Sequence, residues 1–89
     1  MIFVVIPGPG AEAELQARVT TRYEKRIQIH SAPGQWLIAA DGTAKDVSDR
    51  LGISSEKPDD IGPAVVLAIV GYWGREPNNV WEWIAANAG

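Results

Sequence analysis

Two uninterrupted apolar stretches, residues 2–6 and residues 64–70, mark buried strands in this chain. Both are rich in β-branched residues, which favour strands over helices. Pro7-Gly8-Pro9-Gly10 follows the first stretch and predicts a turn. Each strand is therefore expected to be buried along most of its length.

Between these strands the apolar spacing changes to that of a helix and then to that of a hairpin. Leu15, Val19 and Tyr23 recur every four residues, which predicts an amphipathic helix from Ala11 to near Lys25. Residues 26–30 alternate polar and apolar and predict a strand with Ile27 and Ile29 on its buried face. After a turn at residues 31–34, residues 35–40 form the returning strand.

Two further helices are predicted. Thr43 and Asp46 have the spacing of a capping box, and Gly52 suits a left-handed helix end, so the second helix lies between them. Its apolar stripe consists of Ala44, Val47 and Leu51.

The last helix begins near Asn78. Val80, Trp81, Ile84 and Ala88 share one of its faces, while Trp83 projects elsewhere.

The resulting order is strand, helix, strand, strand, helix, strand, followed by an added C-terminal helix. This order is that of the ferredoxin-like βαββαβ arrangement in the α+β class. It predicts one domain over residues 1–89, with a four-stranded antiparallel sheet. The first and third strands are central, the fourth lies beside the first, and two helices cover one face.

This arrangement conflicts with the two fully apolar strands. A sheet covered on one face shows alternating strands, but residues 2–6 and 64–70 are apolar at every position. Either the C-terminal helix or the sheet of a second subunit covers the second face. We favour a homodimer formed through the sheet.

Composition narrows the chemistry. The chain has no cysteine and one histidine, so we expect no disulfide, no metal site and no cofactor. No signal peptide or membrane helix is indicated, which predicts a cytoplasmic protein without a membrane partner. The net charge is −3, with +1 in residues 1–45 and −4 in the remainder, which disfavours broad binding to nucleic acid.

Four short motifs resemble a known family. They are Gln35-Trp36-Leu37-Ile38, the helix of residues 43–51, Gly71-Tyr72-Trp73-Gly74 and Val80-Trp81-Glu82-Trp83-Ile84. Together they resemble the SinR-like small prokaryotic proteins, which are similar to the compact endonuclease of CRISPR adaptation. The resemblance implies a ferredoxin-like homodimer.

In that nuclease family the first strand ends in an acidic residue, and paired subunits bring two such carboxylates to a shared metal ion. Val5-Ile6-Pro7-Gly8 occupies this place here and contains no acid. We therefore expect no catalytic residue, and a divergent metal-dependent nuclease is the alternative.

Aromatic side chains supply the first candidate site. Three of the four tryptophans lie after residue 71, and large aromatics complete a core or anchor a partner. We expect packing between the hairpin, the fourth strand and the last helix, with some rings left exposed beside an arginine. The candidate interface or binding residues are Trp36, Tyr72, Trp73, Arg75, Trp81 and Trp83.

Basic side chains along the first helix supply the second candidate site. Arg18, Arg22 and Lys25 follow one edge of the helix, and Arg26 comes next, so these four residues are candidate phosphate contacts. Glu14 and Glu24 dilute the charge, and long basic side chains also flank apolar faces without a ligand. The overall expectation is a non-enzymatic dimeric accessory or binding protein, with a regulatory nucleic-acid-binding module as a further alternative.

Overall fold

The computed structural model describes residues 1–32, 34–53, 63–71 and 78–87. The strands are β1 (Ile2–Pro7), β2 (Gln28–Ala32), β3 (Gln35–Ala39) and β4 (Ala64–Ile69). The helices are α1 (Glu12–Arg22), α2 (Ala44–Leu51) and α3 (Asn78–Asn87), and a short 3-10 helix, η1 (Lys25–Ile27), precedes β2. No helix within these ranges is long and apolar enough to span a membrane.

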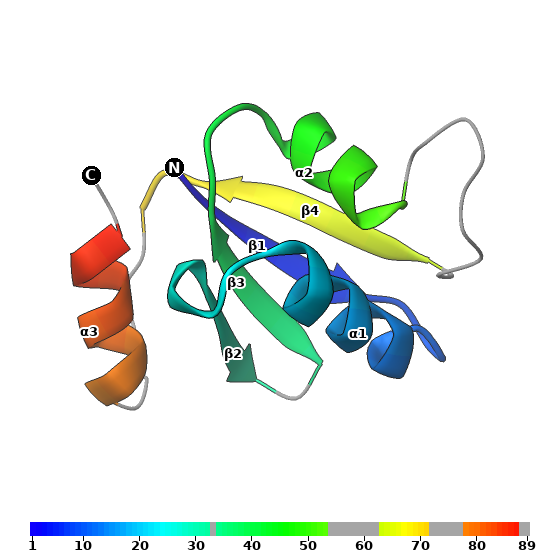
Figure 1. Ribbon diagram of the computed structural model, residues 1–89, viewed down its shortest axis with the longest axis horizontal. Helices are drawn as coiled ribbons and strands as arrows, with labels where there is room; N and C mark the ends of the chain where they lie inside the picture. The colour runs from blue at the N-terminus through cyan, green and yellow to red at the C-terminus, as the bar shows by residue number, and fades with distance from the viewer. Residues whose placement is uncertain (33, 54–62, 72–77, 88–89) are drawn as a thin grey trace.

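The four strands form one antiparallel sheet in the order β2-β3-β1-β4 (Figure 1). β1 and β3 are the inner strands, and β4 lies beside β1 at one edge. The pairing of β1 with β4 is continuous from Ile2 opposite Ile69 to Pro7 opposite Ala64. The predicted α+β class, with a four-stranded antiparallel sheet and a C-terminal helix, is confirmed.

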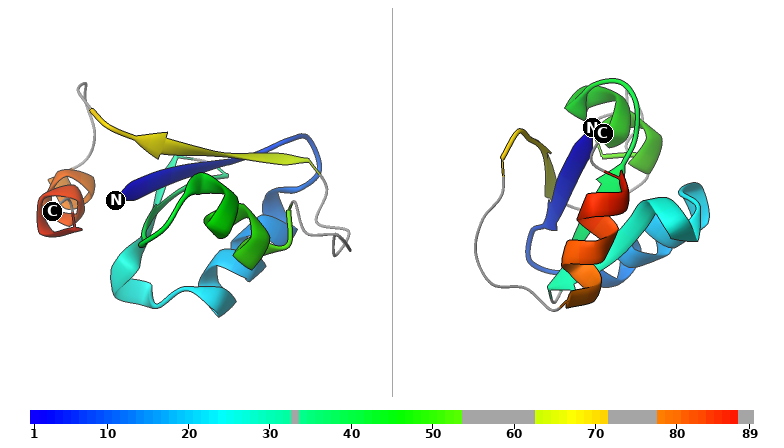
Figure 2. Two further views of the ribbon diagram at one scale, coloured as in Figure 1. Left: turned by 90° about the horizontal axis from the view of Figure 1, so that it is seen from above. Right: turned by 90° about the vertical axis from the view of Figure 1, so that its left-hand side faces the viewer.

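Helices α1 and α2 lie on one face of the sheet (Figure 2). The main core fills the space between them because alternate residues of β1 and β3 point toward the helices. Its fully buried members are Phe3, Val5, Leu15, Val19, Ile38, Val47 and Leu51.

Local hydrogen bonds fix the position of α2. The hydroxyl of Thr43 accepts a bond from the Asp46 N–H (3.2 Å), and the Asp46 carboxylate accepts one from the Thr43 N–H (2.8 Å). Gly52 ends the helix at φ 79°, a left-handed conformation that glycine adopts without steric cost. Both features agree with the sequence-based prediction.

Helix α3 packs against a second apolar cluster. Val80 and Ile84 are buried against Ile2 and Leu37, which point away from the main core. The predicted apolar face of α3 is thus confirmed for these two residues. The C-terminal helix thus covers part of the second face of the sheet. This was one of the two alternatives, the other being the sheet of a second subunit.

One predicted strand boundary is wrong. The chain leaves α1 at Arg22 and forms η1, so β2 begins at Gln28 instead of residue 26. Ile27 lies in η1 and packs against the main core, whereas Ile29 packs against the second cluster. The two isoleucines do not share a face, because the 3-10 helix removes Ile27 from the alternation of the strand.

Candidate functional site

Two of the four candidate phosphate contacts are used to join helices. Arg18 Nε lies 3.1 Å from Glu14 Oε1, and Arg18 Nη1 donates to the carbonyl oxygen of Leu51 at 3.0 Å. Arg22 Nη1 donates to the carbonyl oxygen of Arg50 at 2.7 Å. Both guanidinium groups therefore face the C-terminal end of α2.

The other two basic candidates lie at η1, and both are exposed. Arg26 Nε is 2.9 Å from Glu24 Oε2, and both side chains are largely in solvent. An exposed pair of this kind is weak and opens readily. Of the predicted basic edge, Lys25 and Arg26 therefore form the part directed at solvent.

The three tryptophans in the described ranges do not gather on one surface. Trp36 is 7% exposed and belongs to the main core under α1 and α2. Trp81 and Trp83 are partly buried beside the second cluster, and Trp83 Nε1 donates to the carbonyl oxygen of Arg26 at 3.0 Å.

Within the packing expected between the hairpin, the fourth strand and the last helix, Trp36 belongs to the main core and not to the cluster beside α3, because neighbouring residues of a strand point to opposite faces. The remaining aromatic candidates, Tyr72 and Trp73, and their neighbour Arg75 lie outside the described residues.

The side chain of His30 is exposed, and it makes contacts within the β2-β3 hairpin. Its Nε2 accepts a hydrogen bond from the Gly34 N–H at 3.1 Å, and its ring lies 4.9 Å from the ring of Trp36. It thus stabilises the β2-β3 hairpin.

The acidic residues of α2 have structural roles. Asp46 caps α2, and Asp49 accepts a hydrogen bond from Lys45 Nζ at 2.7 Å. Among the described residues, no group of three or more histidine, aspartate or glutamate side chains is arranged to hold a metal ion.

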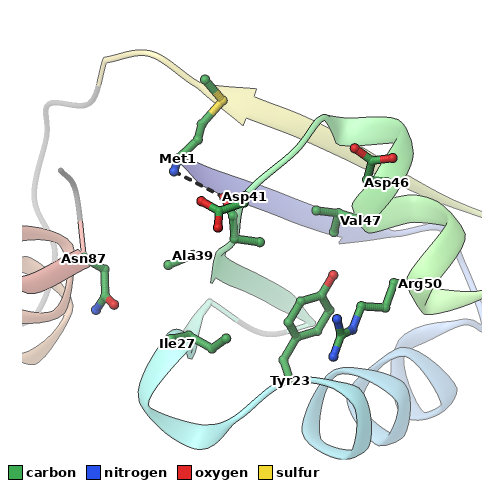
Figure 3. Close-up of a pocket in the computed structure, with 10 residues that line it drawn as sticks. Met1, Tyr23, Ile27, Ala39, Asp41, Asp46, Val47, Arg50 and Asn87 are labelled. Atoms are coloured by element: carbon green, nitrogen blue, oxygen red, sulfur yellow. Dashed lines mark hydrogen bonds between the residues drawn. The ribbon is translucent and has the colours of Figure 1, made fainter.

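A pocket of about 630 Å³ lies between the start of β1, the end of β3, α2 and the last turn of α3 (Figure 3). Tyr23 lines it, with the Arg50 guanidinium carbon 4.8 Å from the centre of its ring. Burial raises the pKa of the Tyr23 hydroxyl above 10.0, and the charge of Arg50 partly opposes this shift.

The carboxylates of Asp41 and Asp46 line the same pocket. Its walls thus carry both signs of charge together with apolar side chains, which allows a small polar molecule to enter but selects no chemical class. Sequence reasoning missed this pocket, since Tyr23 stood out only as a member of an apolar stripe.

The outward face of β4 is the most exposed apolar surface in the described part of the chain. Four large apolar side chains are exposed among the described residues. Val65 (46%) and Leu67 (49%) lie on this face of β4, Val70 (96%) follows the strand, and the fourth is Met1 (55%). Val65 is opposite Ile6 and Leu67 is opposite Val4 in the β1-β4 register. The predicted apolar second face is present. Ile69 of β4 packs against the second cluster, whereas Val65 and Leu67 stay exposed.

Comparison of the chain with protein-family models, with curated proteins and with solved structures finds no match.

Proposed function

We propose that this protein is a small homodimeric module that acts as an accessory or binding protein, with no catalytic centre of its own, and that it associates through the β4 side of its sheet. The exposure of Val65 and Leu67 carries this proposal. Together with Val4 and Ile6 on β1, Val65 and Leu67 form a continuous apolar strip that faces away from α1 and α2.

The energetic reason is the hydrophobic effect. Burying an exposed valine or leucine side chain stabilises a complex by about 1.5–3 kcal/mol, and a half-exposed one by about half as much. Strips of this kind are common at protein interfaces. Small domains also bury a limited share of their surface, so association adds stability that the monomer lacks.

The fold assignment belongs to the same proposal. We infer a ferredoxin-like fold from the order β2-β3-β1-β4, the antiparallel pairing and the two helices on one face. The similarity to SinR-like proteins rests on the sequence motifs. It is consistent with a homodimer that lacks the acidic residue of the CRISPR adaptation nuclease, since Pro7 and Gly8 follow Ile6.

The test is the molar mass in solution, measured by light scattering across a range of protein concentrations. The wild-type chain is expected to have the mass of a dimer, and Leu67→Glu to shift it to the monomer, because a charge cannot be buried unpaired in an apolar interface. Gln16→Glu is the matched control: it adds the same charge on the exposed face of α1 and leaves the mass unchanged. A wild-type mass that stays monomeric would exclude the proposal.

Nucleic-acid binding is a second candidate, favoured by the exposure of Lys25 and Arg26 at η1. Each phosphate contact contributes a slope of about −0.9 to the dependence of log affinity on log salt. Lys25→Ala is then expected to weaken RNA or DNA binding and to lower that slope by about one. Binding that is absent at low salt would exclude this candidate.

A metal-dependent nuclease is the remaining alternative. It predicts cleavage that requires magnesium and is abolished by EDTA.

A further inference from the structure

We propose that the β4 strands of two copies pair edge to edge in antiparallel orientation, about a twofold axis at Leu67, and join the two sheets into one of eight strands, four from each copy. This inference rests on the proposed homodimer and specifies how it is built. Its starting point is a difference between the two edges of the sheet.

The β2 edge is protected against pairing. Its register with β3 is irregular between His30 and Ala32, and α3 packs beside it. Trp83 anchors α3 there through its hydrogen bond to Arg26, just before β2. Irregular register and a covering helix are devices by which proteins prevent edge strands from pairing with other chains.

Within the described residues, the β4 edge has neither an irregular register nor a helix beside its unpaired side; α2 contacts β4 from the face that α1 also covers. Its sequence, Ala-Val-Val-Leu-Ala-Ile, contains no charged residue and no proline, and its pairing with β1 is regular from end to end. Half of the main-chain N–H and C=O groups of an edge strand point away from the sheet. A second strand would continue the hydrogen-bonded ladder on this side.

Symmetry restricts how two identical strands can pair. Residues directly opposite each other in an antiparallel pair lie on the same face of the sheet. A twofold axis perpendicular to the sheet preserves the faces, so the axis must pass a residue that is opposite its own copy. An axis between two residues would place Val66, on the helix side, opposite Leu67, on the open side.

Leu67 is the residue that fits. It is the midpoint of the apolar stretch 64–70, so an axis here pairs the whole stretch with itself and leaves Pro63 outside. Val65 then lies opposite Ile69 of the second copy, and all side chains that meet are apolar. The absence of charge in β4 also means that self-pairing brings no like charges together.

Edge pairing also accounts for the exposure pattern. Val65 and Leu67 are half exposed because β4 has a neighbouring strand on one side only. Flat stacking of two sheets is less suitable, because α3 already occupies part of the second face through Val80 and Ile84. A second copy of β4 would flank Val65 and Leu67 on their unpaired side without displacing α3.

Single cysteines test this geometry directly, because the chain contains none. In Leu67→Cys the two thiols would be opposite each other, with Cβ atoms about 4.5–5.5 Å apart, close to what a disulfide requires. Under mild oxidation this variant is expected to form a disulfide-linked dimer. Val65→Cys alone is not, because its two copies would lie about 14 Å apart along the strands.

Mixing Val65→Cys with Ile69→Cys should restore cross-linking, since these residues are opposite in the proposed register. Gln28→Cys, on the β2 edge, is the control and should not link. A second measurement uses the unmodified protein: hydrogen exchange at β4 amides should slow as protein concentration rises, while exchange at β2 stays constant.

The outcomes separate the two proposals. A dimer in which Val65→Cys links to itself as fast as Leu67→Cys would overturn the edge pairing but leave the homodimer standing. A monomer at all concentrations would overturn both.

Discussion

Arg22 and Arg50 each donate hydrogen bonds from the guanidinium group to the main-chain carbonyl of the other. Arg22 Nη1 lies 2.7 Å from Arg50 O, and Arg50 Nε and Nη2 lie 3.1 and 2.9 Å from Arg22 O. Both carbonyls belong to the last turn of a helix, where they lack partners within the helix and where positive charge is favourable. The pair therefore ties the C-terminal ends of α1 and α2 together.

Arg50→Ala is expected to lower the free energy of unfolding by about 1–2 kcal/mol, through the loss of two charge-assisted hydrogen bonds and of the contact with the Tyr23 ring. Urea unfolding followed by circular dichroism measures this. Arg26→Ala is the control, since it removes an exposed ion pair, and its effect should be below about 0.5 kcal/mol. Equal losses in the two variants would contradict the structural role of Arg50.

The raised pKa of the Tyr23 hydroxyl predicts that the protein loses stability at high pH. Burial raises the pKa of its hydroxyl above 10.0 in the folded protein, more than the Arg50 charge lowers it. Below the unfolded-state pKa the phenol is neutral in both states, and this contribution to stability is complete. Above it the unfolded chain loses its proton first, so stability falls as pH rises toward the folded-state pKa.

Unfolding measured between about pH 9 and pH 11 tests this, because that window spans the ordinary tyrosine pKa. Tyr23→Phe removes the ionisable group and should flatten the decline. A decline of the same steepness in both proteins would assign it to another group.

Gly8 lies in a close main-chain contact with Pro63. Its N–H donates to Pro63 O at 2.6 Å, and a Cβ at Gly8 would lie 2.6 Å from Pro63 Cγ. Gly8→Ala is expected to destabilise the fold by about 1–3 kcal/mol, the range for overpacking. A Cβ at Gly71 would meet no atom of the described residues within 4 Å, so Gly71→Ala should leave the melting temperature nearly unchanged. If both variants melt alike, the contact at Gly8 is not constraining.

Ile84 anchors α3 to the sheet. It is 6% exposed and packs in the cluster with Ile2 and Leu37. Ile84→Ala is expected to cost about 2–4 kcal/mol, the range for truncating a buried aliphatic side chain. Glu82→Ala, on the exposed side of the same helix, should change stability by less than about 0.5 kcal/mol. Unfolding that is insensitive to Ile84→Ala would show that α3 is not docked there.

The elements themselves could be predicted because their signals are local. Thr43 and Asp46 are three residues apart, so the capping box is visible in the sequence. The boundary between α1 and β2 could not be predicted from the sequence. It depends on η1, which places Ile27 against the main core, and this packing has no local sequence signal.

The candidate site was less predictable than the fold. A sequence shows that Arg18 and Arg22 lie on one edge of a helix but not what faces that edge, and here it is the end of α2. A tryptophan can pack in a core or bind a partner, so the residue type does not say which face of the sheet Trp36 lies on. Its position within β3 places it in the main core. The pocket beside Tyr23 has no sequence signature, because its walls come from distant segments.

The sequence alone determined the α+β class, the antiparallel four-stranded sheet, the C-terminal helix and the presence of a second apolar face, because these depend on periodicity and composition. The tertiary structure decided which part of that face stays open. Trp83 and Arg26 are 57 positions apart in the chain and meet where α3 packs beside β2. In the described part of the chain, the cluster beneath α3 reaches Ile69 but not Val65 or Leu67, which stay exposed, since long-range packing decides which part of a sheet a helix covers.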